Sequence, residues 1–202
     1  MSTAPTDRDD DSSIAGVSGN EHLTSLTGAL LLVLLALLGI TVLSVKSLLP
    51  QHFFLGFLVI PPVALKLAST GYRFVKYYTG NPEFRKAGPP HPLTRLLAPV
   101  VVLSTIAVFA TGLELWFFGL RFGSIWVEAH KVSFMGWLVV TGIHVLAYSS
   151  ESGRAAAAEL SSSGFGRGVT ARSLVIASLV AGVVLALASL TYASPFIFFR
   201  DG

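Results

Sequence analysis

The sequence predicts an all-α integral membrane protein with five transmembrane helices. The chain has 202 residues, of which 52% are hydrophobic and only 12% are charged, and its mean hydropathy is strongly positive. This composition cannot supply a water-soluble surface, so most of the surface must face lipid. A helix needs roughly 20 apolar residues to cross the hydrocarbon core of a bilayer. Stretches that meet this condition lie at residues 23–45, 53–78, 93–118, 125–148 and 172–196.

The segments outside these stretches are polar and too short for a second domain. Residues 1–21 are acidic, lack the basic region of a signal peptide, and are expected to form a disordered cytoplasmic tail. Residues 149–171 are rich in Ser, Gly and Ala and are expected to form a cytoplasmic linker, within which residues 154–160 could form a short surface helix. Residues 172–202 are expected to hold the fifth helix and a short outer tail.

The basic residues predict the orientation of the chain in the membrane. On one side, in the N-terminal tail and around the loops after the second and fourth spans, lie Arg8, Arg73, Lys76, Arg85, Lys86, Arg95, Arg154, Arg167 and Arg172. On the other side lie Lys46, Arg121, Lys131 and Arg200. Because cytoplasmic loops carry the excess of Lys and Arg, we expect a cytoplasmic N-terminus and an outer C-terminus. These residues form no basic stripe, which argues against nucleic-acid binding.

Two adjacent prolines, Pro61 and Pro62, fall inside the second span. Each proline lacks a backbone N–H and crowds the preceding turn, so we expect a kink there. A kink of this kind can open space beside a ligand. It can equally be a feature that neighbouring helices tolerate in a membrane.

Histidines at the ends of the spans are the most informative feature of the sequence. The chain has five histidines, and His22, His52, His130 and His144 lie at or inside the ends of spans. His130 and His144 are fourteen residues apart on the fourth span, which places them about 40° apart around the helix and roughly 21 Å apart along it. The fifth, His91, is expected on the surface of a proline-rich loop.

The predicted topology sorts these four histidines by depth. His52 and His130 lie near the outer face, whereas His22 and His144 lie near the inner face. A single membrane histidine most often makes only a hydrogen-bonded packing contact, but packing alone does not predict two pairs stacked across the membrane. The pairs His52 with His130 and His22 with His144 are therefore candidate metal sites.

Two imidazoles favour haem iron over other metals. Two histidines on opposite sides of an iron are a common low-spin haem ligation, and the chain has no cysteine for thiolate sites. Zinc needs about four ligands, and only Glu128 lies near His130 to help. The span glycines Gly56, Gly136 and Gly142 would let a flat macrocycle approach the helix backbones, or equally serve tight helix packing. We therefore expect a four-helix haem-binding bundle over residues 22–148, plus a fifth transmembrane helix.

Two motifs carry a resemblance to a known family. The second span opens as His52-Phe53-Phe54-Leu55-Gly56. The fourth reads His130-Lys131-Val132-Ser133-Phe134-Met135-Gly136 and continues to Gly142-Ile143-His144. Residues 22–148 resemble the bacterial cytochrome b561-type di-haem cytochrome b subunits of formate dehydrogenases and nickel-iron hydrogenases. The resemblance implies two b-type haems, the outer one on His52 and His130 and the inner one on His22 and His144.

The resemblance also implies partners and a location. Catalytic and iron–sulfur subunits of a dehydrogenase or hydrogenase would dock outside, in the bacterial plasma membrane. A quinone, menaquinone or ubiquinone, would be reduced near the inner haem. Lys66 and Arg73 lie in the inner half of the second span, where ionisable residues are costly and usually functional or snorkelling. They could neutralise haem propionates or bind a quinone carbonyl. The alternative for Arg73 is snorkelling to the membrane interface, whereas Lys66 lies deeper and is expected to have a polar partner.

Two other functions remain open from the sequence. A haem-free membrane anchor or assembly subunit would use the histidines only for packing. A self-contained reductase would need a nucleotide or flavin domain, and this sequence holds none. Glu114 and Glu128, near the outer face, are candidates for proton release or partner docking, and are equally suited to be interfacial charges.

Overall fold

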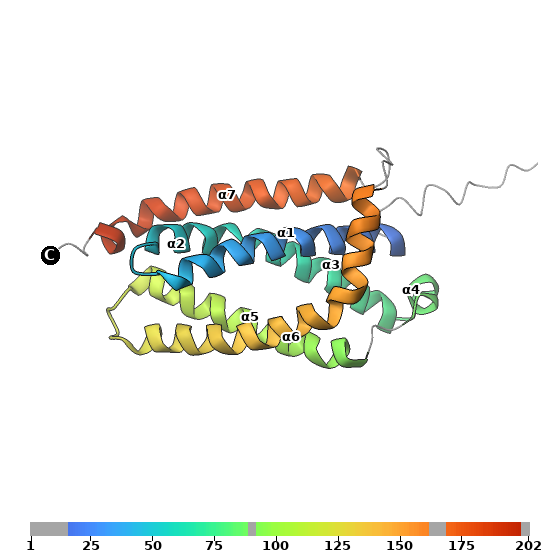
Figure 1. The fold of residues 1–202 in the computed structure, drawn as a ribbon, viewed down its shortest axis with the longest axis horizontal. Coiled ribbons are helices and arrows are strands. Elements are labelled where there is room, and N and C mark those ends of the chain that lie inside the picture. Colours follow the sequence, from blue (N-terminus) through green and yellow to red (C-terminus); the bar gives the residue numbers. More distant parts are fainter. Residues whose placement is uncertain (1–15, 89–91, 162–168, 199–202) are drawn as a thin grey trace, which may run out of the picture. The chain divides into compact units, whose positions relative to one another are not determined.

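The structure is a computed structural model that describes residues 16–88, 92–161 and 169–198. These residues fold into helices joined by short turns, and no strand occurs among them. The helices are α1 (Val17–Leu43), α2 (Leu49–Leu58), α3 (Ile60–Tyr78), α4 (Pro82–Lys86), α5 (Pro92–Phe118), α6 (Ile125–Ser161) and α7 (Val169–Phe198) (Figure 1). By length and composition, five segments can cross a membrane: Val17–Leu43, Leu49–Tyr78, Arg95–Phe118, Ile125–Ala147 and Val169–Tyr192. The predicted all-helical fold with five apolar spans is confirmed.

The chain divides into two compact units. The first unit contains α1 to α4, the end of α6 from Ala155, and α7 as far as Thr191. The second unit contains α5, α6 as far as Arg154, and the end of α7 from Tyr192. Each unit is described by itself below.

In the first unit, α1 packs against α2 and α3 (Figure 1). One face of α1 is buried, and its members recur at the three- and four-residue spacing of a helix: Asn20, Leu23, Thr27, Leu31, Leu34 and Thr41. The other faces of α1 expose large apolar side chains such as Leu32, Val33 and Ile40. In a membrane this pattern is expected, because lipid-facing positions are as apolar as the packed ones.

The second span is interrupted at Val59, between α2 and α3. Pro61 and Pro62 cannot donate to the carbonyls of Phe57 and Leu58, four residues before them, so the regular helical ladder loses two bonds there. The freed carbonyl of Leu58 lies against Gly182 of α7, where a side-chain Cβ would collide with it. The helix is thus interrupted next to the prolines, where a kink was predicted, and Gly182 of α7 packs against this point.

The second unit is built on the hairpin of α5 and α6, which lie side by side (Figure 1). The connecting turn uses positive backbone φ angles at Gly119 (56°) and Gly123 (81°), which favour glycine over other residues. α6 then runs without interruption from Ile125 to Ser161. Both histidines of the fourth span therefore lie on one continuous helix.

The three largest differences between the helix ends and the sequence-based spans are at the start of α1, the end of α6 and the start of α2; in addition, α7 begins at Val169, three residues before its predicted start. α1 begins at Val17, so residues 17–21, expected in the N-terminal tail, are helical. α6 extends to Ser161, so residues 149–161, expected in the linker, continue the fourth helix. α2 begins at Leu49, with Pro50 in its first turn, where the missing N–H of proline costs no hydrogen bond. Residues 1–15, 162–168 and 199–202 of the predicted tails and linker lie outside the described residues.

Candidate functional site

His52 lies in the first turn of α2 and is held by the preceding helix. The hydroxyl oxygen of Thr41, near the end of α1, is 2.8 Å from Nδ1 of His52. Thr41 is 4% exposed, and its hydroxyl also donates to the carbonyl of Leu38 in its own helix. The imidazole of His52 is therefore fixed by a buried polar contact across the α1–α2 turn.

His130 has the same arrangement in the second unit. The hydroxyl oxygen of Thr111 on α5 is 3.0 Å from Nδ1 of His130 and 3.1 Å from the hydroxyl of Ser133. Gly112, next to Thr111, lets the imidazole lie against the α5 backbone, since a Cβ there would be 3.1 Å from Cε1 of His130. About two helical turns away, Trp137 donates to Thr105 across 3.0 Å.

His22 and His144 each have a buried ring nitrogen, Nε2 of His22 and Nδ1 of His144. His22 lies on α1 close enough to Arg172, near the start of α7, for an electrostatic interaction. His144 lies on α6, fourteen residues after His130. Each predicted pair takes one histidine from each unit, so the pairings His52 with His130 and His22 with His144 stay predictions.

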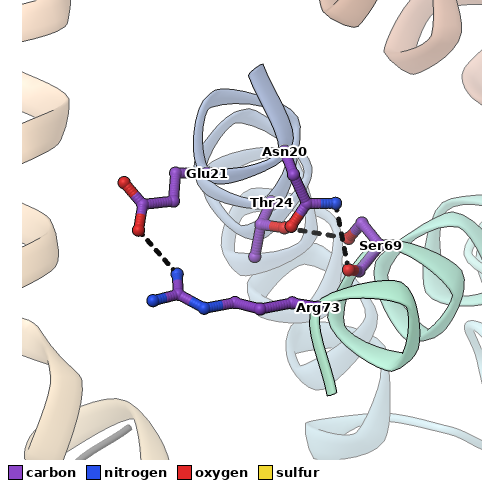
Figure 2. Close-up of polar contacts among 5 residues, drawn as sticks. All are labelled: Asn20, Glu21, Thr24, Ser69 and Arg73. Atoms are coloured by element: carbon purple, nitrogen blue, oxygen red, sulfur yellow. Dashed lines mark hydrogen bonds and ion pairs between the residues drawn. The ribbon is translucent and has the colours of Figure 1, made fainter. Parts of the chain in front are cut away.

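A polar network joins α1 to α3 in the first unit (Figure 2). The amide nitrogen of Asn20 donates to the carbonyl oxygen of Ser69 across 3.1 Å, and the hydroxyl of Thr24 donates to that of Ser69 across 3.0 Å. Asn20 is 2% exposed and Ser69 is 4% exposed. The carbonyl of Ser69 fixes which way the amide of Asn20 points, because only its nitrogen can donate.

Lys66 and Arg73, the two predicted cation sites, lie on α3 and have different partners. Arg73 forms an ion pair of 2.7 Å with Glu21 of α1, and both side chains are partly exposed. Lys66 donates to the backbone carbonyl of Thr24 across 2.7 Å, and its ammonium lies 3.1 Å from where a Cβ of Gly28 would be. No carboxylate among the described residues pairs with Lys66.

The span glycines named from the sequence make no close approach to neighbouring helices. A Cβ added at Gly56, Gly136 or Gly142 would meet no described atom within 4 Å. Tight packing instead occurs at Gly28, Gly112 and Gly182. Glycines without a predicted role also have space beside them. Such space is compatible with a bound ligand but does not show where a ligand binds.

Sequence reasoning missed Thr41, Thr111 and Gly112. A signal for the two threonines was present, because facing residues of a helical hairpin lie about equally far from the turn. Thr41 is two residues before the end of α1, and His52 is three residues after the start of α2. Thr111 and His130 are seven and five residues from the corresponding ends of α5 and α6.

The remaining candidate residues, Glu114 and Glu128, do not form a common site among the described residues. Within the described ranges, no three His, Asp or Glu side chains come together as a metal ion of the zinc type requires. Both carboxylate oxygens of Glu114 on α5 are buried without a hydrogen-bond partner in the described part of the chain. Glu128 pairs with Lys131 on the surface of α6 across 2.8 Å. His91 lies outside the described residues.

Comparisons with known proteins found no relative of this chain. A scan against protein-family models gave no match, and searches of curated proteins and of solved structures gave none either.

Proposed function

We propose that this chain is the membrane electron-transfer subunit of a respiratory complex, of the bacterial cytochrome b561-type. It carries electrons through two b-type haems between a partner dehydrogenase or hydrogenase and the quinone pool. His52 and His130 hold the outer haem, and His22 and His144 hold the inner one. The resemblance of residues 22–148 to that family is the source of the proposal.

The observation that carries the proposal is the placement of two histidines on α6. Because α6 is unbroken between His130 and His144, the two residues are roughly 21 Å apart along the helix axis and about 40° apart around it. This spacing suits two cofactors stacked at different depths. A packing role for either histidine gives no reason for this spacing.

The residues present fit a haem by their chemistry and by the room beside them. Each proposed site needs only two imidazoles, so it does not depend on a third protein ligand. Gly56, Gly136 and Gly142 have no described atom within 4 Å of an added Cβ, which leaves room for a flat group beside these helices. When bound, the haem iron supplies reversible one-electron oxidation and reduction.

The two cations on α3 are not equivalent candidates for an anionic or carbonyl group of a cofactor. Arg73 already has the carboxylate of Glu21. Among the described residues, the ammonium of Lys66 has only a backbone carbonyl as its partner, and a membrane-embedded ammonium normally has a counter-ion. Lys66 is therefore the better candidate for a haem propionate or a quinone carbonyl, with Arg73 serving the α1–α3 contact.

The distribution of basic residues supports one orientation of the chain across the membrane. With the N-terminus in the cytoplasm of a bacterium, His130 lies near the outer face and His144 near the inner one. The catalytic and iron–sulfur subunits then dock outside, and menaquinone or ubiquinone is reduced near the inner pair. Glu114, whose carboxylate is buried on α5, would lie at the outer side.

Purified full-length protein tests the proposal by pyridine haemochrome assay and reduced-minus-oxidised spectra. Wild type is expected to hold two haems per chain with bis-histidine spectra. His130→Ala and His144→Ala are each expected to lose one haem, whereas His91→Ala keeps both. Retention of both haems in the first two variants contradicts the ligand assignment.

The competing function, a haem-free membrane anchor or assembly subunit, gives a different result in the same assay. It predicts no haem absorbance in wild type and unchanged co-purification of partner subunits with His130→Ala. A wild-type protein that stays colourless after expression with added haem precursor would favour this function over electron transfer.

A further inference from the structure

Thr41 and Thr111 occupy equivalent positions in the two units. Each lies on the helix before the histidine, and its hydroxyl oxygen lies within hydrogen-bonding distance of Nδ1, at 2.8 Å from His52 and 3.0 Å from His130. A hydroxyl and a ring nitrogen this close share one proton, and the direction of that bond decides the tautomer of the imidazole.

The direction follows from where each hydroxyl places its own proton. Thr41 donates to the carbonyl of Leu38, and Thr111 donates to the carbonyl of Ala107 across 2.8 Å. A hydroxyl has one proton, so once it has donated to its own helix, its oxygen is left to accept. Nδ1 of both histidines therefore carries the hydrogen, and Nε2 keeps the lone pair that binds a metal.

The surroundings of His130 agree with this direction. The hydroxyl of Thr111 also lies 3.0 Å from the carbonyl of Val108, which can only accept. The neighbouring hydroxyl of Ser133 donates to the carbonyl of Ala129 across 2.7 Å. The hydroxyls of Thr111 and Ser133 therefore both donate to backbone carbonyls, and their oxygens are left as acceptors beside the imidazole ring.

We propose that Thr41 and Thr111 are positioning residues for two proposed haem ligands: each holds its histidine, His52 or His130, in the tautomer that presents Nε2 to an iron, and each lowers the midpoint potential of the haem that its histidine binds. This inference rests on the proposed function. An acceptor at Nδ1–H makes the ring a stronger donor through Nε2, which stabilises the oxidised iron.

Redox titration of the full-length, haem-loaded protein tests this with Thr41→Val and Thr111→Val. Valine keeps the shape of threonine and removes the acceptor. We expect the midpoint potential of one haem to rise in each variant while the other stays unchanged. Thr41→Ser and Thr111→Ser keep the hydroxyl and are expected to keep the wild-type potentials.

Two matched controls lie on the same helices. Thr27 on α1 is fully buried and donates to the carbonyl of Leu23 across 2.7 Å, and Thr105 on α5 accepts from Trp137. Thr27→Val and Thr105→Val remove a hydroxyl without touching either histidine. Both haem potentials are expected to stay at their wild-type values in these controls.

Wild-type potentials in both valine variants overturn the inference, and so does an equal shift in the controls. Loss of one haem in the valine variants with full retention in the serine variants supports the inference.

A wild-type protein without haem would refute the proposed function and leave the tautomer testable by ¹⁵N NMR of labelled imidazoles. Nδ1–H at His52 and His130 is the expected tautomer in that haem-free protein. Nε2–H at either ring overturns the inference.

Discussion

The two units join their helices by different chemistry. In the first unit, α1 and α3 are joined by Asn20 and Ser69 and by the ion pair of Glu21 with Arg73, none of which is a predicted iron ligand. In the second unit, His130 itself lies in the contact between α5 and α6. A substitution at the α1–α3 contact can therefore weaken packing while leaving the predicted ligands in place. At the Thr111–His130 contact, and likewise at the Thr41–His52 contact of the first unit, a substitution changes packing and the surroundings of a predicted ligand together.

The largest effect on stability is expected from Gly182→Ala in the first unit. The added Cβ collides with the carbonyl of Leu58, and backbone atoms cannot move aside as a flexible side chain can. We expect a loss at the upper end of the roughly 1–3 kcal/mol typical of overpacking, measured as thermal unfolding in detergent. Gly136→Ala in the second unit is the control, because no described atom lies within 4 Å of its Cβ. Equal stability of the two variants would refute this contact.

Asn20→Leu is expected to have the next largest effect. It removes the donor to the buried carbonyl of Ser69, and leaving a buried acceptor unpaired costs about 1–3 kcal/mol. The haem content should not change, because the side chain of Asn20 donates to the backbone of Ser69, which is not a predicted ligand. Thermal unfolding and the haemochrome assay measure the two properties on one sample. The control is Gln51→Leu, because Gln51 is exposed on α2. A similar loss of stability in this control would mean that the hydrogen bond from Asn20 to Ser69 contributes little.

Gly112→Val is the corresponding change in the second unit, and its main effect is on haem. The new side chain occupies the space of the His130 ring, which Thr111 holds against the α5 backbone. We expect loss of one haem, with a stability cost of about 1–2 kcal/mol from overpacking. Gly39→Val on α1, which has no described atom within 4 Å of its Cβ, should keep both haems. If Gly112→Val still held two haems, haem binding would not depend on the contact of His130 with the α5 backbone.

The smallest effect is expected from the ion pairs. Glu21→Gln removes the partner of Arg73 between α1 and α3, and partly exposed pairs of this kind contribute about 0.2–1 kcal/mol. Glu128→Gln removes a pair within α6 whose side chains are 64% and 62% exposed, and is expected to cost less. Unfolding at low and high salt measures both, since salt screens exposed charges. A loss in Glu21→Gln that is insensitive to salt would argue against a Coulombic contribution.

Apolar length and charge in the sequence were enough to predict five spans. The start of α5 and the start of α6 fall within one residue of their predicted positions, because prolines and glycines in the flanking loops mark them. The start of α1 and the end of α6 were harder to predict. Residues 17–21 and 149–161 are polar or small, and such residues are compatible with a helix but do not require one.

The sequence by itself determined the helical class and the placement of His130 and His144 on one helix at fixed spacing, because helix geometry relates residue number directly to depth and angle. Only the tertiary structure decided what each side chain meets. Thr41 at His52, Thr111 at His130 and Glu21 at Arg73 are contacts between helices, and they depend on how those helices rotate against each other. That rotation is set by the packing of many apolar side chains together, and no single motif records it.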